Sequence, residues 1–131
     1  MRASLCEAVP AIAVVLWPIC TSAQGLPTRE GTCVQTKISQ LEHRLRSGEN
    51  GPFVTDSGSA VSFDNGGYQV AYEELAAVRR SRRGDQVLVC LIRIPRGCPP
   101  GDARGRIYTT TNLRTMESWT MPDSEHGCGG A

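Results

Sequence analysis

Alternating apolar and polar residues predict a β-hairpin in the middle of the chain. Residues 59–63 and 68–72 alternate in this way, and the turn between them contains Asn65 and Gly66. Asn-Gly accommodates the positive φ angles of a tight hairpin turn. We therefore expect two antiparallel strands joined at this turn.

The chain beyond this hairpin predicts a buried strand and a second hairpin. Residues 87–92 are all apolar, so a strand over residues 85–94 is expected to lie between two neighbours in a sheet. Pro95 ends it. Residues 106–111 and 118–121 then predict a last pair of strands.

Helical spacing replaces alternation over residues 73–83. Leu75 and Val78 lie three positions apart, two glutamates open the segment, and four arginines close it before Gly84. Acidic residues at the start and basic residues at the end match the helix dipole, and glycine suits the C-terminal cap. One short helix is predicted here. Its arginines could bind an anion, although a solvated helix end is the simpler interpretation.

The segment 32–45 fits two patterns. Its apolar residues have the spacing of one helical stripe, at Val34, Ile38, Leu41 and Leu45. The same segment also alternates like a strand from Val34 through Thr36 to Ile38. The spacing favours a helix slightly, whereas the order of the other elements favours a strand.

That order, with the first segment as a strand, is three strands, a helix and two or three more strands. It is the order of an OB-type barrel. We therefore expect a mainly β fold with one short helix (α+β), namely a small OB-like barrel of five to six strands stabilised by disulfides. Residues 32–131 would form a single compact β-rich domain, preceded by a flexible arm over residues 24–31.

The N-terminal residues 1–23 predict a cleavable secretory signal peptide. Residues 8–19 form an apolar run that is too short to span a bilayer, which takes about 20 residues. Thr21-Ser22-Ala23 provides small residues before a cleavage site. A buried N-terminal element is the alternative. We expect an exported protein, periplasmic or secreted, with no membrane span.

Cysteine usage supports export. Two of the six cysteines would leave with the signal peptide, and four would remain: Cys33, Cys90, Cys98 and Cys128. An even number in a small exported domain predicts two disulfides. We prefer Cys33 with Cys90 and Cys98 with Cys128, since the last two lie in Gly/Pro-rich loops and Cys90 needs a partner at core depth. The two other pairings stay open, and a zinc site lacks C-x-x-C spacing.

The motifs in the chain give no catalytic residue. His126-Gly127-Cys128 is similar to the His-Gly-Cys core of the L,D-transpeptidases, but only over three residues, so we interpret Cys128 as a disulfide cysteine. Asp123, Glu125 and His126 come from one loop, which is weak support for a metal site. Arg83-Gly84-Asp85 spells an integrin-recognition tripeptide that is common by chance. No metal and no cofactor are expected, and a formal net charge of +1 argues against nucleic-acid binding.

A binding surface is the remaining hypothesis. Tyr68, Tyr72, Tyr108 and Trp119 could form a stacking platform for a sugar or a base, although aromatic residues on strands usually fill the core. In an OB-like barrel the face would lie between the loops 46–58 and 95–105. The candidate binding residues are Arg96, Asp102, Tyr108, Asn112 and Trp119.

The C-terminal half carries a resemblance. Through Cys98-Pro99-Pro100-Gly101-Asp102, residues 111–115, Trp119 and the ending 126–131, the chain resembles a group of short exported proteobacterial proteins of uncharacterised role. The resemblance implies a periplasmic location and brings no activity. We expect a non-enzymatic periplasmic binding module for a cell-wall glycan or small molecule. The alternative is an inhibitor or interaction partner of an exported cell-wall enzyme, which would present the loop around Cys98.

Overall fold

Six strands and one short helix make up the structure, a computed structural model that describes residues 24–130. The strands are β1 (Cys33–His43), β2 (Ser59–Phe63), β3 (Tyr68–Ala71), β4 (Gln86–Arg93), β5 (Ile107–Asn112) and β6 (Ser118–Pro122). The helix α1 (Ala76–Arg80) lies between β3 and β4. The predicted signal peptide, residues 1–23, lies outside the described residues.

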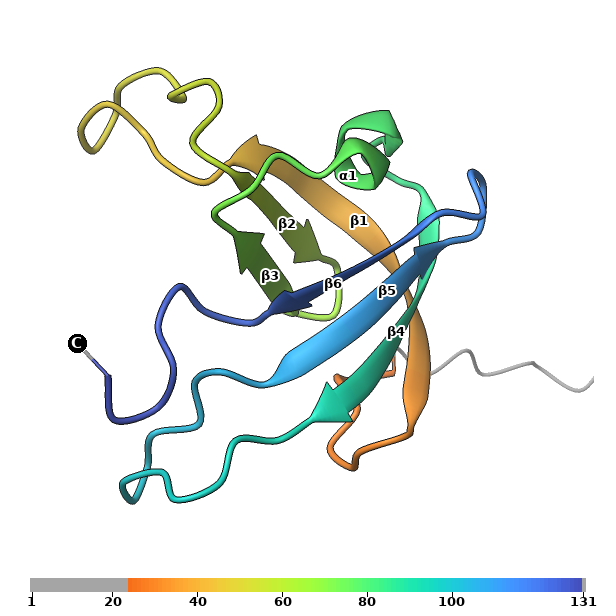
Figure 1. Cartoon of the computed structure of the whole chain (residues 1–131). Coiled ribbons are helices and arrows are strands. Elements are labelled where there is room, and N and C mark those ends of the chain that lie inside the picture. The colour runs from red at the N-terminus through yellow and green to blue at the C-terminus, as the bar shows by residue number, and fades with distance from the viewer. Residues whose placement is uncertain (1–23, 131) are drawn as a thin grey trace, which may run out of the picture.

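All six strands belong to one antiparallel sheet with the order β3-β2-β1-β4-β5-β6. The sheet curls into a half-barrel with α1 at one end (Figure 1). The predicted mainly β fold with one short helix is therefore confirmed. As in the expected OB-like order, β1 pairs with both β2 and β4, and the helix follows β3. β6 extends the sheet by one strand.

A β-bulge in β1 determines which of its residues face the inside. The register with β2 shifts between Ile38 and Gln40, so one extra residue is inserted there. A bulge changes the phase of the alternation, and the inner face therefore passes from Ile38 to Leu41 and then to His43. The resulting spacing of three residues imitates a helical stripe. The segment 32–45, left open by its sequence, forms a strand over Cys33–His43.

The core lies on the concave face of the sheet and is closed at one end by α1. Its buried members come from β1, β2, β4, β5, β6 and the helix, and they are Ile38, Val61, Phe63, Val78, Val87, Val89, Leu91, Tyr108, Trp119 and Met121. Each large apolar side chain buried in this way contributes about 1.5–3 kcal/mol relative to exposure. Val78 is the residue by which the helix joins this core.

Gln69 of β3 connects the two edges of the sheet across the inside of the half-barrel. Its side chain is almost fully buried, with 1 % of the residue exposed. Nε2 donates to the carbonyl oxygens of Tyr108 at 2.9 Å and Met121 at 3.2 Å. Oε1 accepts from Thr110 Oγ1 at 2.6 Å and Trp119 Nε1 at 3.0 Å. Every donor and acceptor of the amide is therefore satisfied.

The first disulfide lies on the convex face of the sheet. Cys33 and Cys90 are direct partners on β1 and β4 and are joined as expected. We had expected Cys90 to need a partner at core depth. That expectation was wrong, because Cys33 is exposed and the bridge lies outside the core. Leu88 and Ile92 share this outer face and are 37 % and 49 % exposed. β4 is central in the sheet, but its second apolar face is turned to solvent.

The second disulfide ties the C-terminal tail to the loop after β4. It joins Cys98 to Cys128, again as expected. Backbone contacts support it, since the Gly129 N–H donates to an Asp102 carboxylate oxygen at 2.9 Å. In Asp102, hydrogen bonds from the Arg104 side chain and from Gly129 hold the pKa of the carboxyl well below its usual range. The tail is thus fastened at several points.

Part of the segment 24–31, which we predicted to be a flexible arm, contacts the domain. Pro27 is buried. The Gly31 N–H donates to the Leu91 carbonyl at 2.8 Å, and the Glu30 carboxylate accepts from the Ile94 N–H at 2.8 Å. These contacts extend the β1–β4 pairing beyond the strand itself.

Candidate functional site

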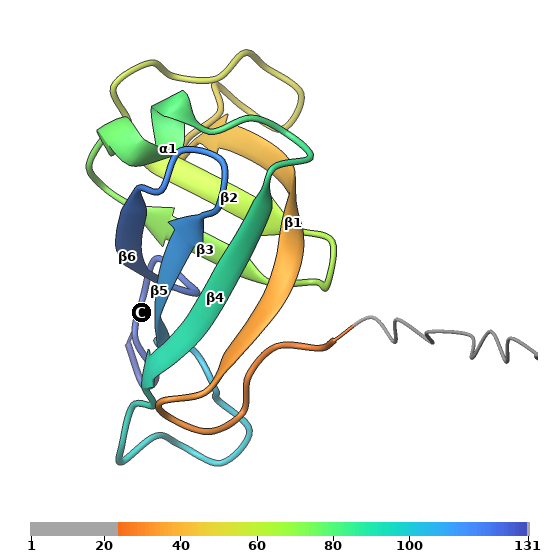
Figure 2. The same ribbon diagram turned by 90° about the vertical axis from the view of Figure 1, so that its right-hand side faces the viewer.

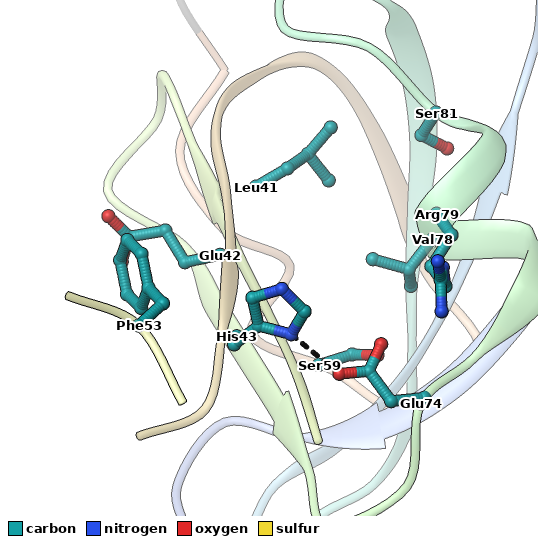
Figure 3. A pocket seen from close by; sticks show the side chains of 9 residues that line it. All are labelled: Leu41, Glu42, His43, Phe53, Ser59, Glu74, Val78, Arg79 and Ser81. Carbon is teal, nitrogen blue, oxygen red and sulfur yellow. Dashed lines mark hydrogen bonds and ion pairs between the residues drawn. The ribbon is translucent and has the colours of Figure 1, made fainter. Parts of the chain in front are cut away.

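A pocket of about 280 Å³ lies between the end of β1, the start of β2, the loop 44–58 and α1 (Figure 3). We call it the α1 pocket. It is lined by both apolar and polar residues, which are Leu41, Glu42, His43, Phe53, Ser59, Glu74, Val78, Arg79 and Ser81. Its volume is near the lower end of ordinary ligand sites, which hold about 300–1,000 Å³.

His43 and Glu74 form a hydrogen-bonded pair in this pocket. The His43 Nδ1 lies 2.6 Å from Glu74 Oε1. The two side chains are 34 % and 18 % exposed, respectively, so the pair is partly desolvated and still within reach of a ligand. The bulge in β1 is what brings His43 to this side of the strand.

Ser59 holds the backbone next to Glu74 in place. Ser59 is the cross-strand partner of His43 and is 2 % exposed. Its Oγ accepts a hydrogen bond from the Leu75 N–H at 2.9 Å. The residue next to Glu74 is thereby bound to the strand beside His43, which brings the carboxylate to the ring.

The pairing determines which ring nitrogen of His43 is free. A carboxylate accepts hydrogen bonds, so Glu74 places the proton on Nδ1. Nε2 then remains for a ligand, as an acceptor when the ring is neutral and as a donor when it is protonated. In Figure 3 this second nitrogen points away from Glu74, on the side of Leu41. A carboxylate behind a histidine in this way orients the ring in many binding and catalytic sites.

Apolar groups and one free cation complete the pocket. Leu41 and Val78 provide aliphatic walls. The Phe53 ring lies 6.3 Å from the His43 ring and packs under the Arg46 guanidinium at 3.9 Å. Arg79 comes from α1, and within residues 24–130 its side chain makes no ion pair or hydrogen bond. The pocket thus offers a partly neutralised carboxylate, a guanidinium and an apolar wall.

Three of the predicted binding residues lie in the interior instead. Tyr108, Asn112 and Trp119 are 2 %, 0 % and 4 % exposed, because the alternation of β5 and β6 turns them to the concave face. Burial also raises the pKa of Tyr108. The proposed stacking platform is therefore wrong, since only Tyr68 and Tyr72 of its four members are exposed.

Asn112 has a structural role beside α1. Its Nδ2 donates to Ser81 Oγ and to an Asp85 carboxylate oxygen, both at 2.8 Å. The same carboxylate accepts from the Arg114 guanidinium at 2.8 and 2.9 Å. The hydrogen bonds from Arg114 and Asn112 hold the pKa of Asp85 well below its usual range. The acid of the tripeptide 83–85 is therefore engaged inside the protein and not displayed.

The loops 46–58 and 95–105 do not flank one mouth of the barrel. β1 and β4 run antiparallel with Cys33 opposite Cys90, so the chain leaves β4 beside the start of β1. The loop 46–58 follows the end of β1 and lies at the opposite end of the half-barrel (Figure 2). Arg96 and Asp102 are thus remote from the α1 pocket, and the expectation of a shared binding face is corrected.

The His126-Gly127-Cys128 triplet does not supply a thiolate. The Cys128 sulfur is bonded to Cys98, and His126 is exposed. Across residues 24–130, no group of three or more His, Cys, Asp or Glu side chains is placed to hold a metal ion. The tail therefore acts as a tethered segment in this structure.

The His43–Glu74 pair of the α1 pocket has no motif in the sequence. The two residues are 31 positions apart, and no local pattern links them as an acid–base pair. The one local signal was the interval between Ile38 and Leu41, which fits a strand only if a bulge lies between them. That signal was interpreted as helical spacing.

Comparisons with protein-family models, with curated proteins and with solved structures found no match. Function therefore has to be argued from the geometry of the chain itself. Within the described residues, no helix has the length and apolar character needed to cross a membrane.

Proposed function

We propose that this protein is an exported, non-enzymatic binding module whose ligand site is the α1 pocket. One observation carries the proposal: His43, held by Glu74 at 2.6 Å, lines a small pocket with aliphatic walls, and its Nε2 has no hydrogen-bond partner among residues 24–130. Pockets with an apolar lining and a few convergent polar groups are the usual form of small-ligand sites.

Export is supported by the two disulfides and by the signal-like pattern of residues 1–23. Disulfides persist in oxidising compartments and are rare in the cytosol. The resemblance to exported proteobacterial proteins favours the periplasm. A cell-wall glycan or a small molecule of that compartment is the ligand class we assign.

A binding role fits the pocket better than acyl-transfer catalysis. Such catalysis needs a nucleophile hydrogen-bonded to its base. The nearby Ser59 hydroxyl accepts the Leu75 N–H, and no hydrogen bond joins it to His43 among the described residues. The Cys128 sulfur is part of a disulfide.

The loop 95–105 supports a second candidate function, namely an inhibitor or partner of an exported enzyme. Its exposed apex at residues 99–101 stands on the Cys98–Cys128 bridge. A rigid exposed loop loses little conformational freedom on binding. A pull-down that retains one stoichiometric enzyme would favour this function if substitutions at the apex release the enzyme and substitutions in the α1 pocket do not.

An NMR titration tests the leading proposal. The full chain, expressed for export and purified from the periplasm, is titrated with soluble cell-wall fragments while its backbone amides are followed. We expect saturable shifts for His43, Leu41 and Val78, with Arg96 and Asp102 unmoved. Shifts confined to Arg96 and Asp102, or no saturable shift, would reject the α1 pocket as the ligand site.

A further inference from the structure

The charges around the α1 pocket restrict the kind of group that can enter it. The Glu74 carboxylate, partly exposed beside His43, disfavours an incoming anion. Arg79 also lines the pocket and disfavours a cation. Burying a charge without a partner is costly, so a neutral polar group fits best.

The pocket also requires an apolar portion in that group. Leu41 and Val78 form aliphatic walls that only a hydrocarbon group covers favourably. A hydroxyl alone could form a hydrogen bond with His43 Nε2, but it would leave Leu41 and Val78 exposed to water. With a volume of about 280 Å³, the pocket accommodates one substituent or one sugar ring of a ligand, and the rest of the ligand stays outside.

A secondary amide with a methyl group satisfies all of these conditions. Its N–H can donate to the neutral His43 ring at Nε2, and its carbonyl can accept from the same nitrogen when the ring is protonated. Arg79 supplies a further donor for the carbonyl. The methyl group covers Leu41 and Val78.

Two sources of such an amide are a peptide and an N-acetylated sugar, and the polar groups of the pocket favour the sugar. Extended peptides commonly bind by adding a strand to a free sheet edge. The part of β1 that borders the pocket pairs with β2, while β4 pairs only with Cys33–Lys37, so the open edge beside the pocket is a few residues long and short for an added strand. The Glu74 carboxylate and the Arg79 guanidinium instead offer an acceptor and a donor for ring hydroxyls.

We propose that the α1 pocket binds the acetamido group of an N-acetylated sugar, with His43 Nε2 and Arg79 as its polar contacts and Leu41 and Val78 around its methyl group. The proposal rests on the binding function assigned to this pocket. It narrows that function from glycans and small molecules in general to N-acetylhexosamine units.

The experiment compares three probes on the full exported chain by calorimetry and amide NMR. They are the trimer of N-acetylglucosamine, the trimer of glucosamine, and trialanine as a peptide mimic that carries no acetyl group. We expect the acetylated trimer to bind at the α1 pocket at least tenfold more tightly than either of the others, which corresponds to about 1.4 kcal/mol.

Variants assign the contacts. His43→Phe keeps a ring and removes Nε2, and His126→Phe is the matched control at an exposed histidine. Arg79→Gln changes an exposed side chain outside the core and serves if His43→Phe fails to fold. We expect His43→Phe and Arg79→Gln each to weaken binding of the acetylated trimer at least fivefold, and His126→Phe to leave it unchanged.

The outcomes separate the two proposals. Equal binding of acetylated and deacetylated trimers at the pocket would overturn the acetamido assignment and leave the binding function intact. Pocket shifts with the peptide mimic alone would overturn it in favour of a peptide. If cell-wall fragments also leave the pocket amides unmoved, the binding function itself fails.

Discussion

Replacing Gln69 with leucine is expected to be one of the most damaging single changes in the domain. Leucine has a similar size, so no large cavity forms, and the effect isolates the hydrogen bonds. Trp119 Nε1 and Thr110 Oγ1 both donate to Gln69 Oε1 and would lose that acceptor in a buried site. Each unsatisfied buried group costs about 1–3 kcal/mol, which gives a loss of about 2–6 kcal/mol. A domain of this size has about 5–15 kcal/mol in total.

Urea unfolding followed by fluorescence measures this loss. Of the two tryptophans, Trp17 and Trp119, only Trp119 lies outside the predicted signal peptide, so the signal reports on the residue that Gln69 contacts. Gln35→Leu is the matched control, since Gln35 is exposed and its side chain donates to the exposed Gln86 side chain. This variant should change stability by less than about 0.5 kcal/mol. Equal unfolding free energies for the two variants would refute the role given to Gln69.

Three further changes test other parts of the structure. Gly58→Ala should destabilise the domain by more than about 1 kcal/mol in thermal melts, because Gly58 has a φ of 117° and an added Cβ would overlap the Ala71 carbonyl; Gly48→Ala, where there is open space, should cost less. Asp85→Asn should flatten the acid limb of a stability–pH curve. The pKa of Asp85 is lowered in the folded state, so its contribution is present above the unfolded value of about 3.9 and is lost as pH falls below it; parallel acid limbs for both proteins would reject this. Replacing Cys98 and Cys128 with serines should lower the free energy of unfolding by about 2–4 kcal/mol and make the tail sensitive to limited proteolysis. A tail as resistant as in the unchanged protein would show that Asp102 and the backbone contacts hold it without the bridge.

Local chemistry in the sequence was enough to predict every strand except β1, whose segment stayed open between helix and strand. The Asn65-Gly66 turn and its flanking alternation placed β2 at Ser59–Phe63, as found. The change of period located the helix, although α1 is shorter than residues 73–83 and begins at Ala76. Leu75 has an extended backbone, and its N–H donates to Ser59 Oγ. The helix therefore does not extend back to Glu74.

The candidate site could not be predicted, because it depends on pairing between distant strands. The bulge in β1 exists only in relation to β2, and without it His43 would face the opposite side of the strand. Likewise, Asn112 resembles a surface residue until Ser81 and Asp85 are placed beside it. Asn112 was interpreted as a binding residue because its partners lie 31 and 27 positions away in the chain.

The most direct test of the α1 pocket is the tautomer of His43. Long-range proton–nitrogen NMR of the two histidine rings, at a pH where both are neutral, reads which nitrogen carries the proton. We predict that His43 is protonated at Nδ1, held there by Glu74, and that Glu74→Gln shifts the pattern, whereas the exposed His126 keeps the pattern of a free imidazole. If His43 and His126 give the same pattern, and Glu74→Gln changes neither, the pair does not form in solution and the pocket built on it is contradicted.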